Sequence, residues 1–178
     1  PVPLHGVATR TGTGGPAAFE LVNIHVTVRG TKRTFSALTG SDGSYVATFT
    51  PLPGEAGVYA VAAGHPGVAD PPTQDSFALY GMKVYAVGDL HVIEGSSASS
   101  STTVENLSTV PLTGLSVTVL TNPPDLMVTA NLSTNVLAGD GSIQLGYSVT
   151  VPAGTVMGGV AKMRITSAEG VSADFNLP

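Results

Sequence analysis

The chain of 178 residues contains no cysteine and no tryptophan, and only 11% of its residues are charged. The absence of cysteine excludes disulfide frameworks and thiolate metal sites. Small secreted animal domains usually depend on disulfides, so a cysteine-free secreted chain fits a bacterial or archaeal origin better. Because charges are scarce, the solvated faces must be covered mainly by serine, threonine, asparagine and glycine, a composition common in secreted and cell-surface β-proteins.

Long apolar runs are also missing. No segment approaches the roughly 18 residues that a membrane span needs, so we expect no membrane insertion. No signal peptide is recognisable, and the chain begins at Pro1 rather than at methionine. We therefore expect a processed or excised piece of a longer protein, for which a missing signal does not argue for the cytoplasm.

Basic charge is sparse as well. The sequence has 7 lysines and arginines against 12 acidic residues, which gives a net charge of −5. Arg29, Lys32 and Arg33 cluster, but they flank an expected hairpin turn at Gly30-Thr31. Because the chain has no basic stripe that could neutralise phosphates, nucleic-acid binding is disfavoured.

Alternation with a period of two is what the sequence has in abundance. Apolar and polar residues alternate from Val22 to Arg29, from Ile143 to Val151 and from Val171 to Leu177. Such a strand buries one face and wets the other, and no stretch shows a competing helical period. Glycine (22 residues) and proline (13 residues) separate the runs as turns. The sequence therefore predicts an all-β fold.

The strands fall into two groups with similar punctuation. In the first half, the Asp-Gly of Gly40–Gly43 predicts a hairpin between the flanking strands 34–39 and 44–50. In the second half the predicted strands are residues 103–106, 115–120, 126–132, 142–151, 157–167 and 171–177. Regularly spaced strands with tight turns predict two tandem Ig-like (Greek-key) antiparallel β-sandwiches, residues 1–87 and 88–178.

The boundary between the two domains falls between residues 81 and 95. Met82–Val87 alternates, and it either closes the first domain or opens the second. Ser96–Thr103 has the composition of a flexible linker. We interpret it as strand, because serine and threonine continue into Val104 without glycine or proline and threonine is a good strand former.

Both halves resemble known families of extracellular modules. Leu4–Val7, Val22–Val28 and Thr39–Tyr45 resemble a carboxypeptidase-regulatory-like (prealbumin-type) β-sandwich, although Gly40 stands where an aspartate is common. Val104–Asn106, Pro111–Val117 and Leu137–Gly141 resemble bacterial Ig-like repeats of the CARDB and alpha-galactosidase-associated type. These resemblances imply a non-catalytic module of a large extracellular protein, with no catalytic set to transfer.

Histidine offers little evidence of a metal or catalytic site. His5, His25, His65 and His91 are too far apart for metal-ligand spacing, and none has an adjacent carboxylate. His25 falls on the polar face of its strand, where we expect it to be solvated. We predict no catalytic residue, no resident metal and no cofactor.

Calcium is the better metal candidate, because it prefers hard oxygen ligands of the kind that turn loops supply. Asp42, Asp70, Asp75 and Asp140 are the options. Each carboxylate is alone in its loop, whereas calcium loops usually bring several acids together. We interpret these aspartates as turn residues that bond to their own backbone.

Three short motifs give no evidence of a functional site. Gly12–Gly15 lacks the lysine and the following helix of a phosphate-binding loop. Asn106-Leu-Ser108 and Asn131-Leu-Ser133 match the glycosylation sequon, at a number expected by chance in a chain this rich in serine and threonine. No Gly-x-Ser-x-Gly nucleophile elbow is present.

Aromatic residues could form a carbohydrate platform, because sugar-binding sandwiches stack rings on exposed faces. The first half and the junction supply Tyr45, Phe49, Tyr59, Phe77, Tyr80 and Tyr85. Several fall on inward positions, so we expect packing in the core or, for Tyr80 and Tyr85, at the junction.

Together these observations predict a non-catalytic structural, spacer or adhesion segment of a larger secreted or cell-surface bacterial protein. The expected partners are other domains of the same polypeptide and an extracellular protein or glycan. The alternative is an accessory ligand-binding module of a secreted enzyme, such as a carbohydrate-binding module, that grips its ligand through the end loop Gly64–Gln74. A hydrolase with its site built from loops is a third class that no motif supports.

Overall fold

The computed structural model describes residues 1–154 and 158–178, and every regular element in these residues is a β-strand. This confirms the all-β prediction, and no helix in the described part of the chain could cross a membrane. The strands are β1 (Val2–Val7), β2 (Leu21–Val28), β3 (Thr31–Leu38), β4 (Ser44–Phe49), β5 (Gly57–Gly64), β6 (Asp75–Leu79), β7 (Met82–Val84), β8 (Ser97–Asn106), β9 (Ser116–Thr121), β10 (Met127–Leu132), β11 (Ser142–Thr150), β12 (Ala161–Thr166) and β13 (Ser172–Leu177).

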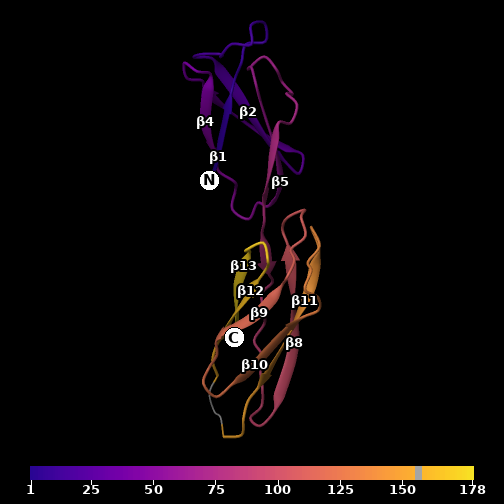
Figure 1. The fold of residues 1–178 in the computed structure, drawn as a ribbon. Helices are drawn as coiled ribbons and strands as arrows, with labels where there is room; N and C mark the ends of the chain where they lie inside the picture. Colours follow the sequence, from indigo (N-terminus) through magenta and orange to yellow (C-terminus); the bar gives the residue numbers. More distant parts are fainter. Residues whose placement is uncertain (155–157) are drawn as a thin grey trace. The chain divides into compact units, whose positions relative to one another are not determined.

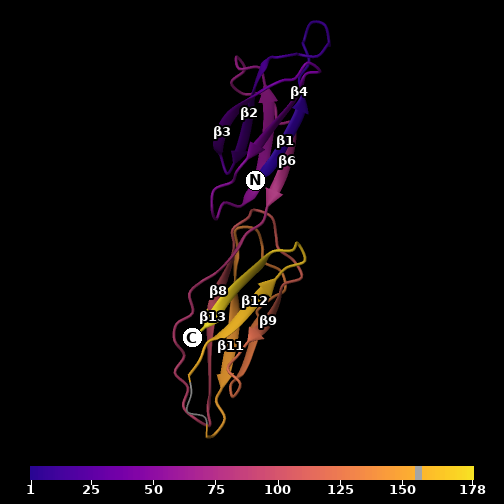
Figure 2. The same ribbon diagram turned by 90° about the vertical axis from the view of Figure 1, so that its left-hand side faces the viewer.

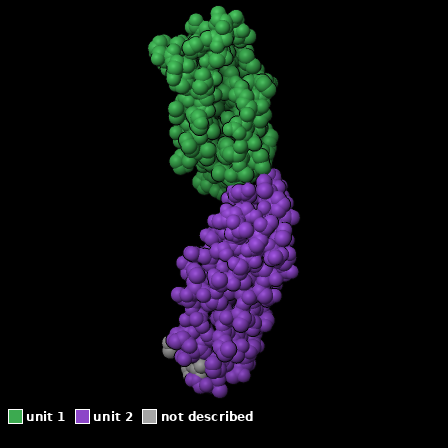
Figure 3. All heavy atoms as spheres, in the orientation of Figure 1, with its two compact units in different colours: residues 1–79 green, residues 80–178 purple. Residues whose placement is uncertain are grey.

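The chain divides into two compact units, residues 1–79 and residues 80–178 (Figure 3). The segment 80–87, which the sequence-based boundary assigned to the first domain, lies in the second unit. Its strand β7 pairs with the end of β8, from Met82 opposite Asn106 to Val84 opposite Val104. The serine-rich residues before Val104 form strand β8 rather than a linker, as predicted.

Unit 1 consists of two antiparallel sheets, a four-stranded sheet in the order β3-β2-β5-β6 and a two-stranded sheet of β1 and β4 (Figures 1 and 2). Strands β2 and β3 form a hairpin through Arg29 and Gly30, both with positive φ (47° and 78°). Positive φ at both central residues is the geometry of a type I′ turn, whose twist matches that of the strands it joins.

The hairpin predicted at Gly40–Gly43 is wrong, because β3 and β4 lie in different sheets. The turn itself is present, since the Gly43 N–H donates to the Gly40 carbonyl at 3.0 Å and Gly43 has a φ of 80°. Strand β3 pairs with β2, and the chain crosses after the turn to the other sheet, where β1 pairs with β4. A tight turn therefore fixes the reversal of the chain but not the partner of the next strand.

The core of unit 1 lies between its two sheets. The apolar residues of β2 that alternate from Val22 to Val28 are all at most 5% exposed, and they pack with Phe49 of β4 and Tyr59 of β5. The Tyr59 ring stacks on that of Phe77 with centroids 4.8 Å apart. The alternation read from the sequence is thus the inward face of the central strand.

Unit 2 pairs a four-stranded sheet, β10-β11-β8-β7, with a three-stranded sheet, β13-β12-β9. If these strands are lettered A to G in chain order, the sheets read DEBA and GFC. This is the strand order of a constant-type immunoglobulin sandwich, a Greek-key fold. Unit 2 therefore has the predicted Ig-like topology, whereas unit 1 has six strands and a different order.

The core of unit 2 comes from both of its sheets. Leu145 and Tyr147 of β11 are buried, as are Met163 and Ile165 of β12. The strand predicted at 157–167 corresponds to β12, and Met157 lies outside the described residues. Each unit therefore contains its own apolar core.

Candidate functional site

The four histidines do not converge. His5, His65 and His91 are exposed, and the described residues contain no group of three or more side chains that could hold a metal ion. His25 differs from the prediction that it is solvated, because it is only 7% exposed.

His25 is buried because the loop between β5 and β6 folds over the outer face of the sheet. Lys32 holds this loop, since its Nζ donates to the Ala69 carbonyl (3.2 Å) and forms an ion pair with Asp70. The His25 Nδ1 shares a hydrogen bond with Thr34 Oγ1 at 2.8 Å. Its Nε2 is buried and has no partner among the described residues.

A cleft of about 330 Å³, which we call the loop cleft, lies beside this imidazole. Its lining includes His25 and Thr27 of β2, Lys32 of β3, and Asp70 and Thr73 of the loop. The Lys32 ammonium lowers the pKa of the Asp70 carboxyl by hydrogen bonding and by charge. The cleft therefore combines a buried imidazole with one paired cation and anion.

The structure does not bring together the aspartates considered as calcium ligands: Asp42 and Asp140 lie in different turns, and Asp70 lies in the loop before β6, which begins at Asp75. Asp42 accepts hydrogen bonds from the Ser44 N–H (3.0 Å) and hydroxyl (2.7 Å), which lower its pKa. Asp75 accepts from the Ser76 N–H at 2.7 Å. Asp140 occupies the turn before β11 with a φ of 53°. Asp42 therefore bonds within its own turn, and Asp75 bonds to the backbone of its neighbour at the start of β6.

Carboxylates that the sequence did not single out hold other parts of the backbone. Glu169 accepts the backbone N–H of Thr113 at 3.0 Å and its hydroxyl at 2.6 Å, and these bonds lower its pKa to about 2. Arg33 forms a two-pronged bond to Glu55, with both oxygens 2.8 Å from its Nη2. Sequence spacing gave no signal for either pair, because their members are 56 and 22 residues apart.

Asn106 of the first sequon is buried, at 1% exposure, and fixes three loop carbonyls of unit 2. Its Nδ2 donates to the carbonyls of Val110 (2.8 Å), Ala138 (3.1 Å) and Leu137 (3.3 Å). Its Oδ1 accepts from the N–H and hydroxyl of Ser108, the other sequon residue. This asparagine is therefore a structural residue, inaccessible to a glycan in the folded chain.

Three of the aromatic residues considered for a platform form part of a core instead. Phe49, Tyr59 and Phe77 pack together inside unit 1, and the Arg33 guanidinium lies 4.4 Å from the centroid of Phe49. Tyr85 is exposed, and its hydroxyl donates to Glu105 at 2.8 Å. In unit 1 the exposed apolar residues are mostly aliphatic.

A second cleft of about 610 Å³ lies at the end of β1, and we call it the β1 cleft. Its lining includes residues 7–11 and 63–65, together with Val22 and Tyr45. Tyr45 reaches this position because Gly6, its partner across the ladder, has no side chain: a Cβ at Gly6 would clash with the Tyr45 hydroxyl and ring.

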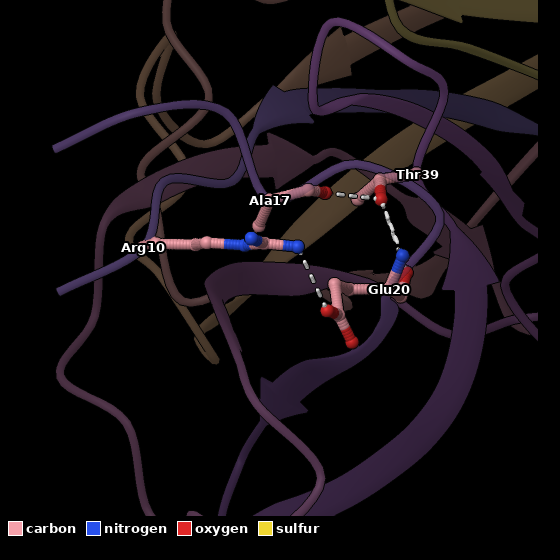
Figure 4. Close-up of polar contacts among 4 residues, drawn as sticks. All are labelled: Arg10, Ala17, Glu20 and Thr39. Carbon is pink, nitrogen blue, oxygen red and sulfur yellow. Dashed lines mark hydrogen bonds and ion pairs between the residues drawn. The ribbon is translucent and has the colours of Figure 1, made fainter. Parts of the chain in front are cut away.

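The charged residues on the lining of the β1 cleft are paired with each other. Figure 4 shows the Arg10 guanidinium directed at Glu20, with Nη2 3.4 Å from Oε1. The buried Thr39 hydroxyl donates to the Ala17 carbonyl (2.5 Å) and accepts the Glu20 N–H (2.9 Å). Thr39 thus fixes the backbone from which Glu20 reaches Arg10.

Comparison with family models and with curated protein sequences finds no match. Among solved structures, the chain is similar to a protein of unknown function from Porphyromonas gingivalis W83, with 14% identity over 92% of this chain and 87% of that chain and a TM-score of 0.38. It is also similar to the major pilin subunit of Bacillus cereus, with 11% identity, coverage of 99% and 67%, and a TM-score of 0.36.

A third similar structure is a tetra-tandem repeat in the extending region of a large adhesion protein. It shows 17% identity and a TM-score of 0.34, over 99% of this chain and 45% of that chain. The fold described above rests on the strand order of each unit. Membership of the carboxypeptidase-regulatory-like and CARDB families stays a prediction.

Proposed function

We propose that this chain is a non-catalytic structural, spacer or adhesion segment of a larger secreted or cell-surface bacterial protein. One observation carries the proposal: several polar side chains of the kinds that serve in binding or catalysis are instead hydrogen-bonded to the chain's own loops. Asn106, Glu169 and the Arg33–Glu55 pair all have this role. Side chains held in this way make a β-module resistant to deformation, since each bond must break before its loop can move.

The two separate cores also support a structural role. Each unit has a core of its own, so each can fold and bear load as a domain. The low charge and the lack of cysteine, noted in the sequence, suit a bacterial surface protein. Other domains of the same polypeptide would be its covalent partners, with an extracellular protein or glycan bound through its surface.

Single-molecule stretching of the full chain between two handles tests this role. We expect two separate unfolding events under load. At up to roughly 3.6 Å per residue, they would release about 28 nm for residues 1–79 and about 36 nm for residues 80–178, less the folded lengths. A single event, or extension at negligible force without discrete events, would count against a load-bearing segment.

A second function, an accessory ligand-binding module, is favoured by the loop cleft. His25, whose Nε2 has no partner among the described residues, lies under the loop that the sequence suggested as a ligand grip, and the Lys32–Asp70 pair holds that loop to β3. A glycan array tests this alternative with the wild-type chain and Asp70→Asn, a change at an exposed carboxylate. Glycan binding that disappears in the variant supports this function, and equal binding signals from both proteins would exclude it.

A further inference from the structure

The two sheets of unit 1 differ in width, and this leaves part of the core half-covered. The two-stranded sheet of β1 and β4 faces a sheet of four strands. Val26 and Tyr59 are fully buried, whereas four apolar residues of β5 and β6 that pack against the same core are only partly buried. These are Val61, Ala63, Phe77 and Leu79.

Strand β1 has one edge without a neighbouring strand in the described part of the chain, since it pairs only with β4. The Ala8 N–H, which follows the strand, donates to the Gly43 carbonyl at 2.9 Å. In an antiparallel ladder the backbone groups alternate in direction. The N–H and C=O groups of His5 and Val7 therefore point away from β4, toward the open edge.

The β1 cleft lies next to this edge. It extends from Val7 and the residues after β1 to the end of β5 at Ala63 and Gly64. The chain thus places unpaired backbone groups beside a hollow whose mixed lining includes the apolar core residue Val22. A third strand of the narrower sheet would lie against β1 at the spacing of about 4.8 Å that strands keep.

We propose that unit 1 binds an extended peptide, which adds to the open edge of β1 as a third strand. Strand addition satisfies edge backbone groups through the ladder and places alternate side chains in a neighbouring hollow. The inference deepens the adhesion role proposed above and rests on it for its biological meaning.

The lining also defines the chemistry of this peptide. Arg10 and Glu20 already neutralise each other, so the inward residues of the peptide need carry no charge. The lining is mixed, with polar residues such as Thr9 and Gln74 beside the apolar Val22 and Ala63. Apolar side chains at alternate positions of the peptide can contact the apolar part, while the side chains between them face solvent. The partner is therefore an uncharged strand that alternates apolar with polar residues.

The position of Pro3 sets where the peptide pairs. Its place in the ladder directs its nitrogen to the open edge, where proline has no N–H to donate. The peptide can therefore form complete rungs at His5 and Val7 but not at Pro3. Proline on an edge strand also limits uncontrolled pairing with other chains.

The experiment uses the full chain and an acetylated, amidated peptide that alternates valine with threonine. Backbone amide exchange is followed by NMR with and without the peptide. We expect the amides of His5 and Val7 to exchange freely in the unbound chain and to become protected about tenfold or more in the complex. The Gly6 amide, which faces β4, should be protected in both states.

Two proline variants make a matched pair for this test. Val7 and Val46 lie on the same two-stranded sheet with similar exposure, 67% and 73%. Val46 is opposite His5, so its N–H faces the far edge of β4. We expect Val7→Pro to weaken peptide binding about tenfold or more and Val46→Pro to leave it unchanged. Equal effects of both variants would overturn the proposal.

A tethered strand decides the outcome if the free peptide does not bind or if Val7→Pro does not fold. The valine–threonine strand is joined to Pro1 through an Asn-Gly turn, which gives an effective concentration on the order of millimolar or more. Protection of the His5 and Val7 amides in this chain supports the proposal, and free exchange overturns it. If the tethered strand does not pair with β1 but the chain still unfolds in two mechanical events, this inference is wrong and the proposed function stands.

Discussion

Replacement of Asn106 tests how firmly the loops of unit 2 depend on one buried side chain. In Asn106→Ala, each of the three loop carbonyls keeps another donor within the unit. The N–H of Ser108, which is fully buried, loses its acceptor. An orphaned buried donor costs about 1–3 kcal/mol, and each lost net hydrogen bond costs about 1 kcal/mol. The three lost bonds and the orphaned donor together predict that unit 2 loses about 4–6 kcal/mol of unfolding free energy.

Asn106→Asp separates the donor role of this side chain from its acceptor role. The carboxylate can still accept from Ser108, but it presents a negative charge to three carbonyl oxygens. An uncompensated buried charge costs about 3–5 kcal/mol, so at pH 7 this variant should be at least as unstable as the alanine variant. Burial raises the folded-state pKa of such an aspartate, so its deficit relative to alanine should shrink as the pH falls.

The assay is urea unfolding of the full chain, followed by NMR signals from unit 2, at pH 7 and at pH 4. The midpoint should fall in both variants with little change in the slope against urea. An alanine variant within 1 kcal/mol of the wild type, or an aspartate variant as stable as the wild type at pH 7, would refute the reasoning.

Two further predictions concern other contacts. Gly6→Ala should destabilise unit 1 by about 1–3 kcal/mol in the same urea titration, because the new Cβ meets the Tyr45 ring. Gly12→Ala is the control and should leave the stability unchanged, because a Cβ at Gly12 meets no other part of the chain within 4 Å. Equal midpoints for the two variants would contradict this contact. The hydrogen bonds from Thr113 lower the folded-state pKa of Glu169 from 4.5 to about 2. They therefore stabilise unit 2 above about pH 4.5, and this stabilisation is lost as the pH falls toward 2. Glu169→Gln should remove this part of the pH dependence of Tm, and identical Tm curves for variant and wild type between pH 5 and 2 would exclude the assigned role.

Much of the fold could be predicted from local alternation. The run from Val22 to Val28 identified the inward face of β2, and the run from Ile143 identified that of β11. These predictions succeed because burial of one sheet face imposes the period of two on the strand itself. The signal lies within each strand and needs no knowledge of its neighbours.

Strand partners and loop paths could not be predicted in this way. The turn at Gly40–Gly43 suggested a hairpin, but β4 pairs with β1, about forty residues earlier in the chain. His25 lies on the outward face, as its period indicates, yet the loop held by Lys32 and Asp70 covers it. Both outcomes depend on contacts between distant residues, which leave no periodic mark in the sequence.

The candidate binding edge left one trace in the sequence. Proline within a strand indicates an edge strand, because it cannot donate to a ladder. Pro3 lies within β1, between Val2 and Leu4, and is therefore such a trace. The cleft itself depends on the different widths of the two sheets, which only the arrangement of all six strands reveals.

The central claim is that each unit is a β-sandwich stabilised by its own core, and two single substitutions test it most directly. Val26 is fully buried in unit 1, and Tyr147 is 5% exposed in unit 2. A carboxylate at either position has no partner for its charge. In NMR spectra of the full chain, Val26→Asp should unfold unit 1 and leave the unit 2 signals in place, and Tyr147→Asp should do the reverse. Loss of both units in either variant, or wild-type spectra from either, would contradict the account.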